Sequence, residues 1–241
     1  MPEIRELIRE GKGKRMYATE DPDLAVVYYK DEAMAFHGLK RGRILGKGEI
    51  NNAIGKHLFT LLKEHGVENH FIRQLDARQS LVYRCEMMRY AVKVRNRVAG
   101  SLHTRTGLPV GMKLEQPVIE FVLKDTELDQ DPLVNHTHLL AMKASTMEEI
   151  EEVRRLSRRI NEILSAYMSE INIELIDFKI EFGRFKGKIL LADELSPDTA
   201  RFWDSSTHEP LDIDRFKRDL GDVKEAYQEV LHRMMGMNGA E

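Results

Sequence analysis

The chain has 241 residues, which is enough for one large domain or for two unequal ones. Hydrophobic residues make up 42% and charged residues 32%, with 7 Pro and 16 Gly, which excludes collagen-like, low-complexity and globally disordered proteins. The 37 basic and 40 acidic residues leave a net charge of -3, so no global positive field draws the chain to nucleic acid or to an anionic membrane.

The cysteine content and the longest apolar segments point to a cellular location. Cys85 is the single cysteine, so the sequence offers neither an internal disulfide nor a CxxC motif. Every apolar stretch is far shorter than the ~20 residues of a membrane helix. Residues 1–10 carry charges of both signs where a signal peptide has an apolar core. We therefore expect a cytoplasmic protein.

The first third of the chain alternates strand-like segments with one helix. Residues 23–30 and 79–88 are rich in Val, Tyr and Leu and are bounded by turn residues, so both are predicted strands. Between them, apolar residues recur at helical spacing over residues 50–62, and Gly66 follows as a terminator. These elements predict a β-α-β arrangement.

The middle of the chain contains two further strands and a long helix. Residues 89–96 and 117–124 are predicted strands, with Pro117 as the first residue of the second. An apolar stripe at helical spacing begins after Thr146, which forms a capping-box pattern with Glu149. This is the most clearly indicated helix in the sequence.

The last third contains a predicted hairpin and a final helix. Residues 171–183 alternate like a strand, residues 184–187 form the turn, and residues 188–194 form the second strand. An amphipathic pattern then predicts a helix over residues 223–235.

The hairpin contains the first candidate site. A period of two places Asp177, Lys179 and Glu181 on one strand face, while the apolar residues between them face the core. Asp193 follows an apolar run, where a charged residue is costly unless it has a partner. Glu181 and Asp193 are therefore candidate ligands for a shared divalent cation such as magnesium. Cross-strand ion pairs on a solvent-facing edge explain the pattern equally well.

Two basic segments are candidate anion sites. Glycines in the Gly11-Lys12-Gly13-Lys14 segment allow close backbone approach and its lysines could neutralise phosphate, although a solvated basic turn also explains it. Neither a P-loop nor GxGxxG occurs. Residues 84–105 hold six basic residues against one acidic residue, and Arg95-Asn96-Arg97 leads to Gly100-Ser101 as a predicted phosphate cradle. Small phosphoesters are favoured over nucleic acid, because the patch offers only two tyrosines for base stacking.

Five segments of the sequence carry a resemblance to a known family: Gly11-Lys12-Gly13-Lys14, residues 94–102 (VRNRVAGSL), 177–183 (DFKIEFG), 192–198 (ADELSPD) and 201–204 (RFWD). With these motifs in order along nearly its whole length, the chain closely resembles the SAICAR synthetases, or phosphoribosylaminoimidazole-succinocarboxamide synthases.

The resemblance implies an ATP- and magnesium-dependent ligase of de novo purine biosynthesis. Such an enzyme joins L-aspartate to the carboxylate of CAIR, a carboxylated aminoimidazole ribotide, through an acyl phosphate, and releases SAICAR, ADP and phosphate. The implied fold is α+β and two-lobed, related to ATP-grasp enzymes and protein kinases. Its nucleotide cleft lies between a β-rich N-terminal lobe, residues 1–88, and a larger α/β lobe, residues 89–241. Small-molecule substrates and a homo-oligomer, with a dimer favoured, are the expected partners, and neither nucleic acid nor a membrane is.

The resemblance also assigns site residues. The residues expected to bind ATP are Lys12, Gly13, Lys14, Glu86, Met87 and Lys124. The residues expected around the ribotide are Arg95, Ser101, Asp177, Lys179, Arg201 and Arg218, of which Asp177 and Lys179 are the catalytic pair. The expected metal-binding carboxylates are Glu181 and Asp193, with Asp131 as a further participant.

Three positions depart from the family pattern. Arg89-Tyr90-Ala91 stands where the family usually has a glutamate, His37 where Asn or Asp is common, and Lys217 where arginine is common. The first two allow a second hypothesis, a related ligase with a different acid or amine. A third hypothesis is a non-catalytic protein that binds nucleic acid or nucleotides through residues 84–105. The hairpin carboxylates argue against it, because polyanion binding gains nothing from them.

Overall fold

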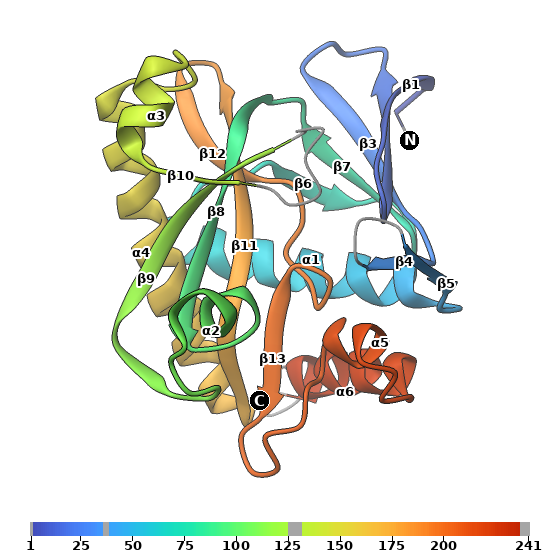
Figure 1. Ribbon diagram of the computed structural model, residues 1–241. Helices are drawn as coiled ribbons and strands as arrows, with labels where there is room; N and C mark the ends of the chain where they lie inside the picture. The colour runs from blue at the N-terminus through green and yellow to red at the C-terminus, as the bar shows by residue number, and fades with distance from the viewer. Residues whose placement is uncertain (1, 36–38, 125–131, 237–241) are drawn as a thin grey trace.

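The computed structural model describes residues 2–35, 39–124 and 132–236. The chain forms two antiparallel sheets, a separate small hairpin and a set of helices, which confirms the predicted α+β class (Figure 1). In the described part of the chain, no helix is long and apolar enough to cross a membrane.

The first sheet is antiparallel throughout, in the order β1-β2-β3-β7-β6. Its strands are β1 (Ile4–Glu10), β2 (Lys14–Thr19), β3 (Leu24–Tyr29), β6 (Phe71–Gln74) and β7 (Gln79–Tyr83). The predicted β-α-β arrangement is wrong, because β3 and β7 pair directly and antiparallel, with Leu24 opposite Tyr83. The helix between them, α1 (Lys47–Glu64), covers the sheet and connects no parallel strands. The small hairpin consists of β4 (Glu32–Ala35) and β5 (Lys40–Arg43).

The second sheet contains β8 (Glu86–Arg97), β9 (Lys113–Leu123), β10 (Leu133–Val134), β11 (Ile173–Phe185), β12 (Lys188–Ala192) and β13 (Ala200–Asp204). The chain passes from the first sheet to the second at Arg84 and Cys85, so the predicted strand over residues 79–88 is two strands in different sheets. Apolar residues continue across this break and hide it in the sequence. The division into lobes between residues 88 and 89 stays a prediction.

Pro117 lies inside β9 and does not begin it as predicted. The register between β8 and β9 shifts between Arg95 and Arg97, next to the proline. On the other side of β9, β10 pairs only with Phe121 and Val122. Proline is therefore tolerated at an irregular, outward-facing position of the strand.

The predicted hairpin is confirmed, with Glu181 opposite Ala192. The first strand continues through Phe185, beyond its predicted end, and the turn consists of Lys186 and Gly187. Both turn residues have positive φ, 48° and 79°, as a two-residue hairpin turn of the mirror-image type requires.

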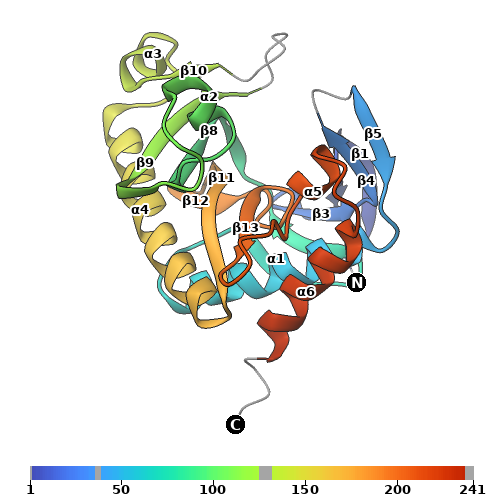
Figure 2. The same cartoon turned by 60° about the horizontal axis from the view of Figure 1, so that its bottom comes forward.

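Helices cover one face of the second sheet and share its core. The longest is α4 (Met147–Glu170), where Thr146 and Glu149 form the predicted capping box. It packs against β11, and α1 contacts both α4 and the last helix, α6 (Val223–Gly236) (Figure 2). The short helices are α2 (Ser101–Thr106), α3 (His136–Ala141) and α5 (Asp214–Lys217).

The segment where the chain passes from the first sheet to the second packs closely against Gly183 of β11. A Cβ atom there would lie 2.5 Å from the Cβ of Cys85 and 3.2 Å from the carbonyl oxygen of Glu86. We therefore expect Gly183→Ala to lower the free energy of unfolding by about 1–3 kcal/mol, measured by urea denaturation. Gly236→Ala, where nothing lies within 4 Å of the added atom, is the control. Equal stability of the two variants would contradict the prediction.

Candidate active site

A cavity of about 980 Å³ lies between the two sheets. The first sheet contributes the turn between β1 and β2, and the second contributes residues of β8, β11 and β13. Twelve of the predicted site residues line this cavity: Lys12, Gly13, Lys14, Met87, Arg95, Ser101, Lys124, Asp177, Lys179, Glu181, Asp193 and Arg201.

Of the other three predicted site residues, two are not on the cavity wall and one is not among the described residues. The side chain of Glu86 is exposed and pairs with Arg184 at 3.3 Å, whereas its neighbours Cys85 and Met87 line the cavity. Arg218 is exposed just after α5, and Lys217 lines the cavity in its place. Asp131 lies outside the described residues, as does His37.

At one end of the cavity, Lys14 of β2 joins the first sheet to the residues that follow the β11–β12 hairpin. Its Nζ lies 2.6 Å from Oδ1 of Asp193 and 3.2 Å from Oε2 of Glu194. Burial alone lowers the pKa of Lys14, but the charges of the two carboxylates more than offset it, so the pKa lies above its ordinary value. Asp193 has a left-handed backbone, with φ 65°, which turns its carboxylate out of the line of β12.

Glu181 is held by two further lysines. Lys124 Nζ donates to its Oε2 at 2.6 Å, and Lys179 Nζ lies 3.2 Å from its Oε1. The two predicted metal carboxylates therefore pair with lysines inside the cavity, and not on a solvent-facing edge. Among the described residues, no group of three or more His, Cys, Asp or Glu side chains is arranged to hold a metal. Two carboxylates still fit magnesium, because this ion commonly takes one or two carboxylates plus substrate phosphates.

A buried polar network lies beneath residues 11–13, the Gly13 turn between β1 and β2, and the sequence did not predict it. Lys47 of α1 is 1% exposed and its ammonium contacts the carboxylate of Asp198. Asn51, one helical turn later, donates to Asp198 at 2.9 Å and to Glu194 at 3.2 Å. Tyr227 of α6 donates to the other oxygen of Asp198 at 2.7 Å. The only sequence signal was the position of Asp198 at the end of a family motif.

At the other end of the cavity, strand register places three charged residues in a row. Asp177 of β11 lies opposite Arg95 of β8 on one side and opposite Arg201 of β13 on the other. Arg95, 2% exposed, donates to Asp177 at 2.9 Å and to Ser101 at 2.8 Å. Arg201 Nη1 donates to both oxygens of Asp177, at 2.8 and 2.7 Å.

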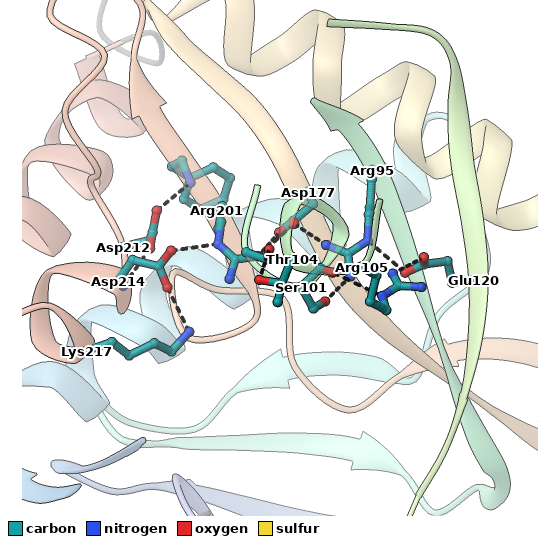
Figure 3. Close-up of polar contacts among 12 residues, drawn as sticks. Arg95, Ser101, Thr104, Arg105, Glu120, Asp177, Arg201, Asp212, Asp214 and Lys217 are labelled. Atoms are coloured by element: carbon teal, nitrogen blue, oxygen red, sulfur yellow. Dashed lines mark hydrogen bonds and ion pairs between the residues drawn. The ribbon is translucent and has the colours of Figure 1, made fainter. Parts of the chain in front are cut away.

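Further side chains extend this row at both ends (Figure 3). Glu120 of β9 accepts from Arg95 Nε at 2.7 Å and also pairs with Arg105. Beyond Arg201, Asp214 accepts from Arg201 Nε at 2.7 Å and from Lys217 Nζ at 2.8 Å. The result is a continuous line of alternating charges from Arg105 to Lys217.

The predicted Arg95-Asn96-Arg97 cradle is wrong in two of its three residues. The Asn96 amide points to the opposite face and bonds Asn161 at 2.8 Å, as a strand period of two dictates. Arg97 lies beyond the register shift and pairs with Glu174. Gly100 of the predicted loop is favoured for a different reason: its backbone has φ 50° and ψ -129°, and a Cβ atom there would lie 2.6 Å from Arg201 Nη2.

Charged groups gather at both ends of a cavity between two sheets, an arrangement typical of an enzyme for small-molecule substrates. The sequence profile of SAICAR synthetase matches residues 7–234, and the chain belongs to this family. It is similar to the phosphoribosylaminoimidazole-succinocarboxamide synthases of Clostridium acetobutylicum and Brevibacillus brevis. The first is 49% identical over 97% of this chain and 99% of its own, and the second is 51% identical over 97% and 98%. The chain is thus an ATP-dependent ligase, as its sequence predicted.

Solved structures of the family have the same fold. The phosphoribosylaminoimidazole-succinocarboxamide synthase of Ehrlichia chaffeensis superposes with a TM-score of 0.92 at 39% identity, covering 95% of this chain and 98% of that one. A SAICAR synthetase in complex with ADP superposes with a TM-score of 0.93 at 42% identity, covering 96% and 98%.

The burial of Arg95 predicts that this residue stabilises the fold as well as the site. Arg95→Ala leaves the enclosed carboxylates of Asp177 and Glu120 without one of their partners, so we expect the free energy of unfolding to fall by about 3 kcal/mol. Arg105→Ala is the control, because Arg105 binds the same Glu120 from an exposed position and should cost about 1 kcal/mol or less. Urea denaturation of both variants tests this, and a comparable loss in each would contradict it.

Proposed function

We propose that this chain joins L-aspartate to the carboxylate of CAIR, using ATP, through an acyl phosphate formed in the cavity between the two sheets. The family match along nearly the whole chain supports the identity of the substrates. The arrangement of lysines and carboxylates at one end of the cavity, and arginines at the other, supports the placement of each substrate.

ATP is proposed to bind at the lysine end. Lys12, Gly13 and Lys14 form the turn over this part of the cavity, and Met87 lines its wall where the chain passes between the sheets. A relative with the same fold is described in complex with ADP. This proposal gives the two sheets the role of two lobes around a nucleotide cleft, as in ATP-grasp enzymes and kinases.

Magnesium is proposed to be held by Glu181 and Asp193. Bound there, the ion would neutralise charge on the transferring phosphoryl group. The lysines that hold these carboxylates, Lys14, Lys124 and Lys179, would then be available to the phosphate oxygens as well. The donor set agrees with phosphoryl transfer, which depends on positioning and charge neutralisation more than on an activated side chain.

The ribotide is proposed to lie along β11. A strand rises about 3.3 Å per residue, so positions 177 and 181 are about 13 Å apart. That span lets a ribotide place its phosphate near Ser101, Arg201 and Lys217 while its carboxylate lies toward Glu181. Lys179 lies between the two ends on β11 and lines the cavity, and in this proposal it neutralises charge where the carboxylate attacks phosphorus.

The alternative hypotheses lose support to different degrees. A nucleic-acid role for residues 84–105 is disfavoured because Arg95 and Arg97 are engaged in ion pairs within the protein.

A ligase with a different amine or acid substrate remains the second candidate. Ala91, where the family usually has glutamate, is fully buried on β8 opposite Glu181, next to the proposed metal site. The homodimer stays a prediction.

The function is tested by a coupled ADP-release assay with CAIR and a panel of amino acids. We expect ADP and phosphate to form only when CAIR and L-aspartate are both present. Release of AMP and pyrophosphate instead would show that the carboxylate is activated by adenylation and not through an acyl phosphate. Release with another amino acid, and not with aspartate, would favour the second candidate.

The metal proposal predicts a large loss of activity in Asp193→Asn. Asparagine tolerates the left-handed backbone at this position, and Lys14 keeps Glu194 as a partner, so the fold should persist. Turnover at saturating magnesium should fall on the order of 10²-fold or more, because a charge that stabilises the transferring phosphoryl group is lost.

Glu174→Gln is the matched control, because it neutralises a carboxylate of the second sheet that pairs with Arg97 and does not line the cavity. Its turnover should stay near that of the unaltered enzyme. Near-normal turnover of Asp193→Asn under the same conditions would refute the metal role.

A further inference from the structure

A buried carboxyl group, Asp212, lies behind the arginine end of the cavity. Its side chain is fully buried and is not part of the cavity wall. Oδ2 accepts a hydrogen bond from the backbone N–H of Phe202 at 2.9 Å, and Oδ1 accepts one from the backbone N–H of Asp214 at 2.8 Å. One side chain thus joins β13 to the first residue of α5.

These two backbone groups belong to the segments that carry the cavity cations. Phe202 directly follows Arg201, and Asp214 is the residue that binds both Arg201 and Lys217. Each Asp214 oxygen is used once, Oδ2 by Arg201 Nε at 2.7 Å and Oδ1 by Lys217 Nζ at 2.8 Å. The separation of the two cations therefore depends on where Asp214 is held relative to β13.

The charges around Asp212 agree with a role in holding α5 against β13. Burial, with the nearby charge of Asp214, raises the pKa of Asp212 to about 7, whereas the pKa of Asp214 is lowered because Arg201 and Lys217 outweigh its burial. The negative charge is thus kept on the residue that contacts the cations. Figure 3 shows Asp212 and Asp214 side by side, with Asp214 directed toward Arg201 and Lys217.

We propose that Asp212 is a positioning residue for substrate recognition: by fixing α5 against β13 it sets the separation of Arg201 and Lys217, and thereby the preference for a substrate with a terminal phosphate. This inference rests on the proposed function, in which those two cations bind the phosphate of the ribotide. Asp212 contacts no substrate and acts through Asp214.

The test compares CAIR with its riboside, which lacks the 5′-phosphate. In Asp212→Ala, kcat/KM for CAIR should fall about tenfold while kcat/KM for the riboside and the KM for ATP stay nearly constant. Asp212→Asn keeps one acceptor oxygen, so it should show a smaller fall in the same direction and serves as the second variant if the alanine protein does not fold.

The control is Asp204→Asn. Asp204 also lies on β13, is buried, and accepts backbone N–H groups, those of Ser206 at 2.9 Å and Thr207 at 2.8 Å, but it is not on the cavity wall. It should lower stability without changing the ratio of kcat/KM between CAIR and the riboside.

Lys217→Ala separates the inference from the function on which it rests. If Lys217→Ala lowers the ratio and neither Asp212 variant does, the positioning role is overturned and the phosphate subsite stands. If Lys217→Ala leaves the ratio unchanged, the subsite assignment fails and the inference fails with it, while ADP release still tests the ligase activity. If the Asp212 variants raise the KM for ATP as much as that for CAIR, Asp212 is only structural and the inference is overturned.

Discussion

The buried guanidinium of Arg95 is the constraint around which the second sheet and its site are arranged. A charge in this position is tolerated only when it is paired and hydrogen-bonded, and its partners come from three different elements: Asp177 of β11, Glu120 of β9 and Ser101 of α2. Asp177 is in turn shared with Arg201 of β13. Fold and site are therefore coupled, because the charges proposed to bind substrate also satisfy one another inside the protein.

A second consequence follows from the length of β11. Its core face is apolar and its other face carries Asp177, Lys179 and Glu181, so one strand spans both ends of the cavity. The arginine end is fixed by register within the second sheet. The lysine end depends on contacts between sheets, because Lys14 comes from β2 and reaches Asp193 across the cavity. Movement of the first sheet would alter the lysine end and leave the arginine end unchanged.

The connection between the sheets is supported from below by α1 and α6. Lys47, Asn51 and Tyr227 converge on Asp198, and Asn51 links this group to Glu194, which also pairs with Lys14. Side chains of α1 and α6 thus determine how the Gly13 turn meets the end of the β11–β12 hairpin. Because these polar groups are enclosed, each depends on the others for its hydrogen bonds.

The sequence by itself determined the local features of this protein. Period-two alternation predicted the two faces of β11, the capping box predicted α4, and five motifs predicted the family, whose resemblance assigned twelve of the residues that line the cavity. The pairing of β3 with β7 and the division of residues 79–88 between two sheets were decided by tertiary structure. So was the role of Lys47 and Asp212, whose partners lie 151 and 10 residues away. Local periodicity reports which face of an element is apolar, whereas strand order and buried ion pairs depend on contacts between distant segments that no local pattern encodes.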